Sequence, residues 1–261
     1  MTTEGSGVEV NKPREACGVF GVLAADSPVA HQTYLRLYAL QHRGQESAGI
    51  AVSDGQNVTV VKDMGLVSSA FDDRILAALE GNVAIGHTRY STTGSSSWRA
   101  SQPFYRDVGN LEFALAHNGN LVNTAELAEG AGMLEGTVTS DSDLVAELVA
   151  LELASEDAPD GDELPWALER VLPRLRGGFS FVAMDRHHLV GARGPEGFWP
   201  LCLGRLDNGW VVASESQALD TVGAHLVREV DPGEMIVIAV SYTHLRAHET
   251  SLHLVCRLLL E

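Results

Sequence analysis

The distribution of short apolar runs along the chain is the strongest constraint on how it can fold. Residues 18–24 form a run typical of a buried strand, and residues 48–53 and 58–62 form two more, separated by a polar loop that contains a glycine. That spacing predicts a β-hairpin. Beyond about residue 178 the chain again consists of short apolar runs separated by Gly, Asp-Asn or Pro-Gly, so strands are expected at both ends of the sequence.

Four other segments carry helical periodicity: 29–40, 123–133, 142–154 and 164–176. Pro173 should bend or end the last of them. Further strands are expected at 82–89 and 112–119, each ending in polar residues. Strands at both ends with helices between them predict an α+β architecture, in which two sheets are sandwiched between helical layers.

The composition argues against several kinds of partner. The chain has 18 Lys and Arg against 35 Asp and Glu, a net charge of −17, so a nucleic-acid backbone or an anionic membrane would be repelled. No apolar run reaches the roughly 20 residues that span a bilayer, and residues 1–16 lack the apolar core of a signal peptide. We therefore expect a cytoplasmic protein with no nucleic-acid and no membrane partner.

The three cysteines, Cys17, Cys202 and Cys256, are too widely spaced to indicate a disulfide framework or a CxxC metal site. Cys17 lies between a polar leader, residues 1–16, and the first predicted strand. It is either a buried structural cysteine or a nucleophile. A nucleophilic thiol needs a base, donors for the oxyanion and anchors for the substrate.

The most economical base is the α-amino group of Cys17 itself. No Cys/His/Asn signature of the papain type surrounds this residue, whereas an α-amino group with a pKa near ~8 suits proton transfer at neutral pH. The free amine exists only after residues 1–16 have been removed. This leader is polar and contains Gly5, Gly7 and Pro13, so it is expected to be a flexible propeptide.

Three later segments could supply the rest of a catalytic site. Arg89 ends a predicted strand, where its planar guanidinium could hold a substrate carboxylate through two hydrogen bonds. The Asn118 side-chain amide and the Gly119 N–H, at the end of another strand, could form an oxyanion hole with two donors. Asp141 and Asp143, which precede a predicted helix, either cap that helix or bind a substrate ammonium.

Each of these residues also has a purely structural alternative. Arg89 could be a surface residue or a member of an ion pair, and Asn118 with Gly119 could form a turn. Histidines lie beside the motifs as well, and a structural role is expected for them: His42, His87 and His117. The occurrence of all these segments in one order is what favours catalysis.

Five segments, in this order, resemble a known family: CGVFG, which begins at Cys17, then LQHRGQESAGIA, GHTRYSTTG, LAHNGNL and TSDSD. They are similar to the N-terminal-nucleophile, or class II, glutamine amidotransferases, and among these to the amidophosphoribosyltransferases, which share the string QHRGQE. The resemblance covers residues 15–238 and implies the four-layer αββα sandwich of N-terminal-nucleophile hydrolases. It assigns residues 17–239 to a glutaminase domain and residues 1–16 to a propeptide.

The resemblance also implies a role for each matching residue. Cys17 would be the nucleophile and, through its freed amine, the general base, with Asn118 and Gly119 as the oxyanion hole. The implied substrate-binding residues are Arg43 and Gly44 at the pocket wall, Arg89 and Thr92 on the α-carboxylate, and Asp141 on the α-ammonium. The implied reaction is hydrolysis of glutamine to glutamate and ammonia through a thioester.

In complete members of the family, a second domain uses the ammonia. The resemblance implies that this domain displaces pyrophosphate from phosphoribosyl pyrophosphate to give 5-phosphoribosylamine, the first step of purine biosynthesis, with Mg2+ and, in some members, an iron–sulfur cluster. Residues 239–261 contain neither the phosphate-binding motif nor the spaced cysteines expected there. We therefore expect the glutaminase half alone, with no cofactor; a homo-oligomer is compatible with the sequence, which does not fix the oligomeric state.

Residues 240–261 break the pattern of the preceding sequence. They contain His244, His248 and His253, together with Cys256 and an apolar end. The segment is either a short amphipathic helix or, as we expect, foreign sequence joined at a cloning or assembly junction. It offers no evident β-partner for the predicted sheets, so its deletion is expected to change stability by less than about 0.5 kcal/mol.

Two other interpretations stay open: another class II amidotransferase, and an unprocessed, non-catalytic domain that binds glutamine or a partner. Intact mass spectrometry separates the catalytic interpretation from the second of these. We expect the purified chain to have lost residues 1–16 and to begin at Cys17, because an internal cysteine has no free amine to act as base. A chain that keeps the leader and still hydrolyses glutamine at a normal rate would contradict this mechanism.

Overall fold

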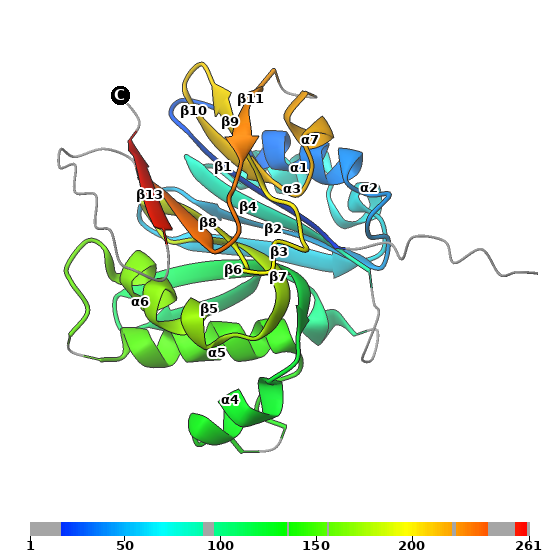
Figure 1. The fold of residues 1–261 in the computed structure, drawn as a ribbon. Helices are drawn as coiled ribbons and strands as arrows, with labels where there is room; N and C mark the ends of the chain where they lie inside the picture. Colours follow the sequence, from blue (N-terminus) through cyan, green and yellow to red (C-terminus); the bar gives the residue numbers. More distant parts are fainter. Residues whose placement is uncertain are drawn as a thin grey trace, which may run out of the picture.

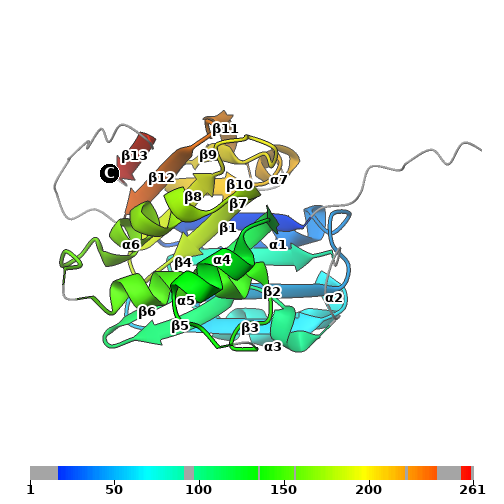
Figure 2. The same cartoon turned by 60° about the horizontal axis from the view of Figure 1, so that its bottom comes forward.

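The computed structural model describes residues 17–90, 97–134, 136–155, 157–220, 223–239 and 254–259. Two β-sheets lie face to face, and helices cover both outer faces (Figure 1). In the turned view, α5 (Asp141–Leu153) and α6 (Glu163–Val171) run across the outer face of the second sheet, and α4 (Thr124–Gly130) lies beside α5 (Figure 2). The predicted α+β sandwich of two sheets between helical layers is confirmed.

The first sheet has seven strands and is antiparallel throughout. Its strand order is β11 (His225–Glu229), β9 (Cys202–Leu206), β10 (Gly209–Ala213), β1 (Gly18–Ala24), β4 (Val83–Arg89), β2 (Ser47–Ser53) and β3 (Val58–Met64). Its outer face is covered by α1 (Val29–Ala39), α2 (Val67–Ala70), α3 (Asp73–Ala78) and α7 (Gln217–Asp220). The predicted hairpin is formed by β2 and β3.

The second sheet has six strands, in the order β13 (Leu254–Leu259), β12 (Glu234–Ala239), β8 (His188–Arg193), β7 (Gly177–Met184), β6 (Leu111–Leu121) and β5 (Phe104–Val108). Its neighbouring strands are antiparallel, except that β12 and β13 are parallel. The tail was expected to offer no β-partner, and this is wrong for β13, which pairs with β12; the alternative of a helix is also wrong for these residues, which form a strand. The small effect expected on deleting the tail loses its physical basis, whereas its foreign origin stays a prediction.

Apolar side chains fill three interfaces, as a sandwich of four layers requires. In β1, Phe20, Val22 and Ala24 belong to the cluster beneath the helices, whereas Val19 and Leu23 belong to the cluster between the two sheets. A strand that is buried on both faces must be apolar at successive positions, which explains why its sequence shows no alternation. A third cluster joins the second sheet to α4, α5 and α6.

The ends of the helices follow from local chemistry. Ser140 caps α5, because its side chain accepts a hydrogen bond from the Asp143 N–H. α6 ends at Val171, and Pro173 lies in the following 3-10 turn, as the sequence predicted. No helix in the described part of the chain is long and apolar enough to cross a membrane.

One end of the sandwich collects the elements that carry the predicted motifs. β1 begins at Gly18, which pairs with Thr88 near the end of β4. The end of β6, in the second sheet, reaches the same place. So does Asp141, which is the first residue of α5. Segments that are far apart in the sequence therefore meet at this end.

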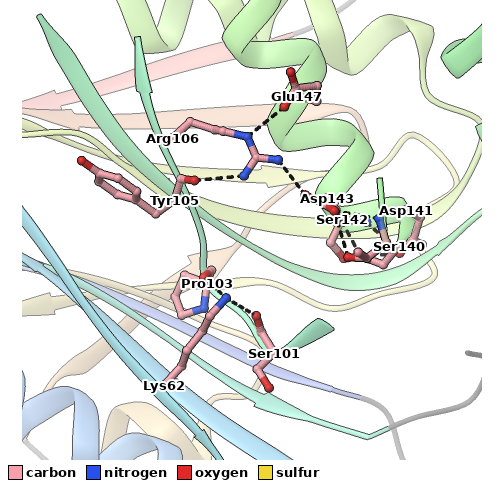
Figure 3. A network of polar contacts seen from close by, with 11 residues as sticks. Lys62, Ser101, Pro103, Tyr105, Arg106, Ser140, Asp141, Ser142, Asp143 and Glu147 are labelled. Atoms are coloured by element: carbon pink, nitrogen blue, oxygen red, sulfur yellow. Dashed lines mark hydrogen bonds and ion pairs between the residues drawn. The ribbon is translucent and has the colours of Figure 1, made fainter. Parts of the chain in front are cut away.

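Arg106 of β5 fixes α5 to the second sheet (Figure 3). Its Nη2 donates to Asp143 at 2.6 Å, and its Nε donates to Glu147 at 2.9 Å. Burial works to raise the pKa of the Asp143 carboxyl, but hydrogen bonds from Arg106 and Thr139 outweigh it and leave this pKa below its usual value. The start of α5, which carries Asp141, is thereby held in place.

Arg106→Met should lower the free energy of unfolding by about 1–3 kcal/mol at neutral pH, the scale of hydrogen bonds to charged groups. Because folding lowers the pKa of Asp143, its contribution is present above the unfolded pKa near ~4 and is lost as pH falls through the folded pKa. In urea unfolding, the difference between the two proteins should therefore shrink below about pH 4. Arg170→Met, which removes a more exposed arginine paired with Glu152, should cost less than ~1 kcal/mol; equal losses from both variants would contradict the role of Arg106.

Candidate active site

A cavity of about 570 Å³ opens at the end of the sandwich where the motifs meet. Four of the residues predicted from the sequence line it: Cys17, Arg89, Gly119 and Asp141. Cys17 directly precedes β1, and the other three come from the end of β4, the end of β6 and the start of α5. Its volume lies in the range of small-molecule sites, roughly 300–1,000 Å³.

The Cys17 thiol is partly exposed and is not part of a disulfide. Its Sγ accepts a hydrogen bond from the Tyr90 N–H at 3.4 Å and lies 3.6 Å from the Tyr90 carbonyl oxygen. Burial raises the pKa of the Cys17 thiol, and the hydrogen bond from Tyr90 and the charge of Arg89 offset this only in part. At neutral pH the thiol is therefore protonated and needs a base before it can attack.

Arg43 lies behind Cys17 rather than on the cavity wall. Its Nε donates to the Cys17 carbonyl at 3.1 Å, and its Nη1 pairs with Glu215. The second carboxylate oxygen of Glu215 lies 3.2 Å from His42 Nε2. These contacts fix the backbone that carries the nucleophile. Glu215 was not found from the sequence, because it lies in a short turn between β10 and α7 that has no periodicity.

Gly44 packs against the end of β4. A Cβ atom at this position would lie 2.6 Å from the carbonyl carbon of Arg89 and 2.7 Å from that of Thr88, so only glycine lets the loop come this close. Neither Arg43 nor Gly44 is among the residues that line the cavity. Their contact with glutamine, which the family resemblance implied, stays a prediction.

Arg89 is held by Glu46, a residue of the QHRGQE string for which no role was predicted. Its Nη1 donates to Glu46 Oε1 at 2.8 Å, while the Glu46 N–H donates to the Arg89 carbonyl at 3.0 Å. Within the described residues, Nε and Nη2 of Arg89 form no hydrogen bond, so both can bind a carboxylate in the cavity. The structural alternative is correct to the extent that an ion pair exists, but this pair is mostly buried and borders the cavity.

Asn118 and Gly119 do not form a turn. Both lie inside β6, where they pair with Ser180 and Phe179 of β7. The Asn118 side chain is buried, and its Nδ2 has no hydrogen-bond partner in the described part of the chain. At Gly119 an added Cβ would lie 2.3 Å from the carbonyl oxygen of Gly178, so no other residue fits. Gly119 lines the cavity, whereas Asn118 is not among its lining residues, so the oxyanion hole formed by these two donors stays a prediction.

The two aspartates divide the roles that the sequence left open. Asp143 accepts hydrogen bonds from Thr139 and from Arg106, so its role is structural. Asp141 lines the cavity, and it accepts the Leu121 N–H at 3.2 Å and the Ser142 N–H at 2.8 Å. Thr92, the other predicted anchor, lies outside the described residues.

The histidines fit the structural role expected for them. His87 is buried, and burial lowers its pKa to about 3. His117 stacks on Phe181 with 4.4 Å between ring centroids, and burial lowers its pKa as well. Both rings are therefore neutral at physiological pH. In the part of the chain that the structure describes, no group of three or more His, Cys, Asp or Glu is placed to hold a metal ion.

Residues 87–221, a little over half of the chain, match the family model described as "Glutamine amidotransferase domain". This chain belongs to that family. Amidophosphoribosyltransferase from Mycobacterium leprae is 51% identical over 246 residues, which cover 91% of this chain and 43% of the relative. The amidophosphoribosyltransferase of Methanocaldococcus jannaschii is 41% identical over 225 residues, which cover 85% of this chain and 47% of the relative.

A solved structure leads to the same family. The glutamine phosphoribosylpyrophosphate amidotransferase from B. subtilis, complexed with ADP and GMP, matches with a TM-score of 0.76 and 38% identity over 85% of this chain and 47% of that one. The amidotransferase domain thus spans somewhat less than half the length of these relatives. The resemblance to the class II amidotransferases of amidophosphoribosyltransferase type, predicted from the motifs, is confirmed.

Two substitutions should separate the roles of Arg89 and Asn118. Arg89→Lys keeps the charge but loses the planar pair of donors, so it should raise the KM for glutamine by about tenfold or more. Asn118→Ala removes a donor needed mainly in the transition state, so it should lower kcat by about 10²–10³ with little change in KM. Arg205→Lys, on β9 away from the cavity, should leave both constants unchanged, and the reverse pattern for the first two variants would reverse the assigned roles.

Proposed function

We propose that this amidotransferase domain hydrolyses glutamine to glutamate and ammonia through a thioester on Cys17. The observation that supports this most is the content of a single cavity, which is lined by a thiol, a cation, an anion and a glycine beside an unpaired amide donor. Such a set matches an α-amino acid with a side-chain amide better than it matches an uncharged or purely anionic ligand.

The two charges define how the substrate would lie. Arg89 takes the α-carboxylate through Nε and Nη2, while Asp141 takes the α-ammonium. The side chain of glutamine then points its carboxamide toward Cys17. Thr92 would support the carboxylate, and Arg43 with Gly44 would contribute from behind the nucleophile.

The chemistry follows from the elevated pKa of the thiol. The free α-amine of Cys17 takes the proton of Sγ as the sulfur attacks the δ-carbon, and the oxyanion is bound by Asn118 Nδ2 and the Gly119 N–H. The C–N bond breaks, and the proton passes from the α-ammonium of Cys17 to the leaving ammonia. Water then attacks the thioester, the C–S bond breaks, and glutamate is released with a regenerated thiol. The amine exists only once residues 1–16 have been removed.

In the whole protein we propose that the ammonia reacts with phosphoribosyl pyrophosphate to give 5-phosphoribosylamine, the activity for which the relatives are named. This step belongs to sequence beyond the domain, as do Mg2+ and an iron–sulfur cluster, for which the described residues offer no group of ligands. A homo-oligomer likewise stays a proposal for the whole protein.

We expect the 261-residue chain, once it begins at Cys17, to hydrolyse glutamine slowly, because the glutamine site can be coupled to an acceptor site only where both are present. It should form no phosphoribosylamine, since that product requires the acceptor site. Cys17→Ala should abolish glutamate release in an enzyme-coupled assay. Cys202→Ala, which removes a buried cysteine of β9, is the matched control and should keep the rate. Normal hydrolysis by Cys17→Ala, or formation of phosphoribosylamine by this chain, would contradict the proposal.

A further inference from the structure

On one side of β6, strand pairing stops before the proposed oxyanion donors, at Leu115. β5 pairs with β6 from Val108 opposite Leu111 to Phe104 opposite Leu115. Two residues further along, this register would set Gln102 opposite His117. β5 begins only at Phe104, so the described strands give His117 no backbone partner on this side.

The side chain of Gln102 takes the place of the absent strand. Its Oε1 accepts the His117 N–H at 2.7 Å, and its Nε2 donates to the His117 carbonyl at 3.4 Å. These are the two hydrogen bonds that a neighbouring antiparallel strand would form with one residue. Gln102 is only 5% exposed, so the loss of its amide would leave the buried His117 N–H unpaired, whereas the His117 carbonyl would keep its contact with His87 Nε2 at 3.1 Å.

The same amide reaches the substrate-binding carboxylate through Ser142. Nε2 donates to Ser142 Oγ at 3.1 Å, and this oxygen lies 3.1 Å from His117 Nδ1 and 3.3 Å from Asp141 Oδ1. Since the Asp141 carboxylate can only accept, the Ser142 hydroxyl donates to it, and His117 Nδ1 carries the proton that it donates to Ser142. This assignment provides a partner for each of these groups from Gln102 to Asp141.

Lys62 of β3 holds the backbone around Gln102 from the outside (Figure 3). Its Nζ donates to the carbonyl oxygens of the two flanking residues, Ser101 at 2.6 Å and Pro103 at 3.3 Å. The ammonium also lies 5.0 Å from the centre of the Phe104 ring. On the inner side, an added Cβ on Gly49 would lie 2.1 Å from the carbonyl oxygen of Gln102, so β2 fixes the segment from there.

We infer that Gln102 is a positioning residue for glutamine hydrolysis, whose side-chain amide holds the oxyanion donors and the ammonium-binding carboxylate of Asp141 at a fixed separation. Its contacts are to His117, which precedes Asn118 and Gly119, and to Ser142, which follows Asp141. The inference rests on the proposed function. Gln102 would then connect the donors at the carboxamide end of glutamine with the carboxylate at its ammonium end, and Lys62 would support Gln102.

The test compares Gln102→Met, which keeps the length of the side chain without its hydrogen bonds, with the wild-type chain processed to Cys17. kcat/KM for glutamine should fall by about 10²-fold, the effect of a small displacement of catalytic groups. Because Asp141 is displaced too, the preference for glutamine over 4-carbamoylbutanoate, which lacks the ammonium, should fall by about fivefold. Gln32→Met, which removes an amide bonded to Ser27 on α1, should change neither value.

Two measurements distinguish positioning from general damage. Alkylation of Cys17 by iodoacetamide, which uses neither the oxyanion hole nor Asp141, should stay within about twofold of wild type. Hydrogen exchange of the backbone at residues 117–119 should become faster. An unchanged kcat/KM for glutamine, or unchanged exchange at these residues, would overturn the inference.

Lys62→Met provides a second variant in case Gln102→Met does not fold. It should give the same pattern with a smaller loss, because it removes only the outer support. If Lys62→Met leaves both the substrate preference and the exchange at residues 117–119 unchanged, the supporting role is wrong. If the wild-type chain releases no glutamate while the exchange responds as expected, the proposed function fails, and what stands is that Gln102 holds residues 117–119 in place.

Discussion

The antiparallel register between β1 and β4 is the constraint on which the site depends. Gly18 pairs with Thr88, so Cys17 falls opposite Arg89, and its thiol reaches the Tyr90 N–H. Burial alone fixes this register weakly, because both faces of β1 are apolar. Its glycines fix it more sharply: an added Cβ would lie 2.8 Å from Thr88 Oγ1 at Gly18 and 2.6 Å from Leu189 at Gly21. A slip of one residue would force a larger side chain into these positions.

The protonation state of the Cys17 thiol follows from the same packing. Burial raises the pKa of Cys17, and Arg89, the nearby cation, is already paired with Glu46. Reactive cysteines elsewhere gain a lowered pKa from a histidine or a helix N-terminus, but the buried histidines here are neutral. The α-amine of Cys17 belongs to the same residue as the thiol. It therefore fits the role of base in this site better than the neutral histidines do.

Sequence alone predicted those parts of the fold that local patterns specify. The strands at 18–24, 48–53, 82–89 and 112–119 were expected within two residues of their ends, because runs buried on both faces stay apolar throughout. Glu46, Gln102 and Glu215 were missed as supports of the site, since a polar residue in a turn or an irregular segment shows no periodicity and gains its role only from distant partners. The strand in the tail was missed for a related reason: a parallel strand pairing is a long-range contact that no local pattern indicates.

Buried polar atoms without a hydrogen-bond partner among the described residues lie both beside the site and away from it. They include Asn118 Nδ2, His117 Nε2 and Ser180 Oγ on β6 and β7, and also three nitrogens of Arg36 on α1. Each such group costs about 1–3 kcal/mol when it stays unpaired, whereas apolar side chains at these positions would only have extended the core. A fold selected for stability alone would replace them. On β6, His117 lines the cavity and Asn118 directly precedes Gly119 of its wall, so part of this cost falls on groups beside the proposed site.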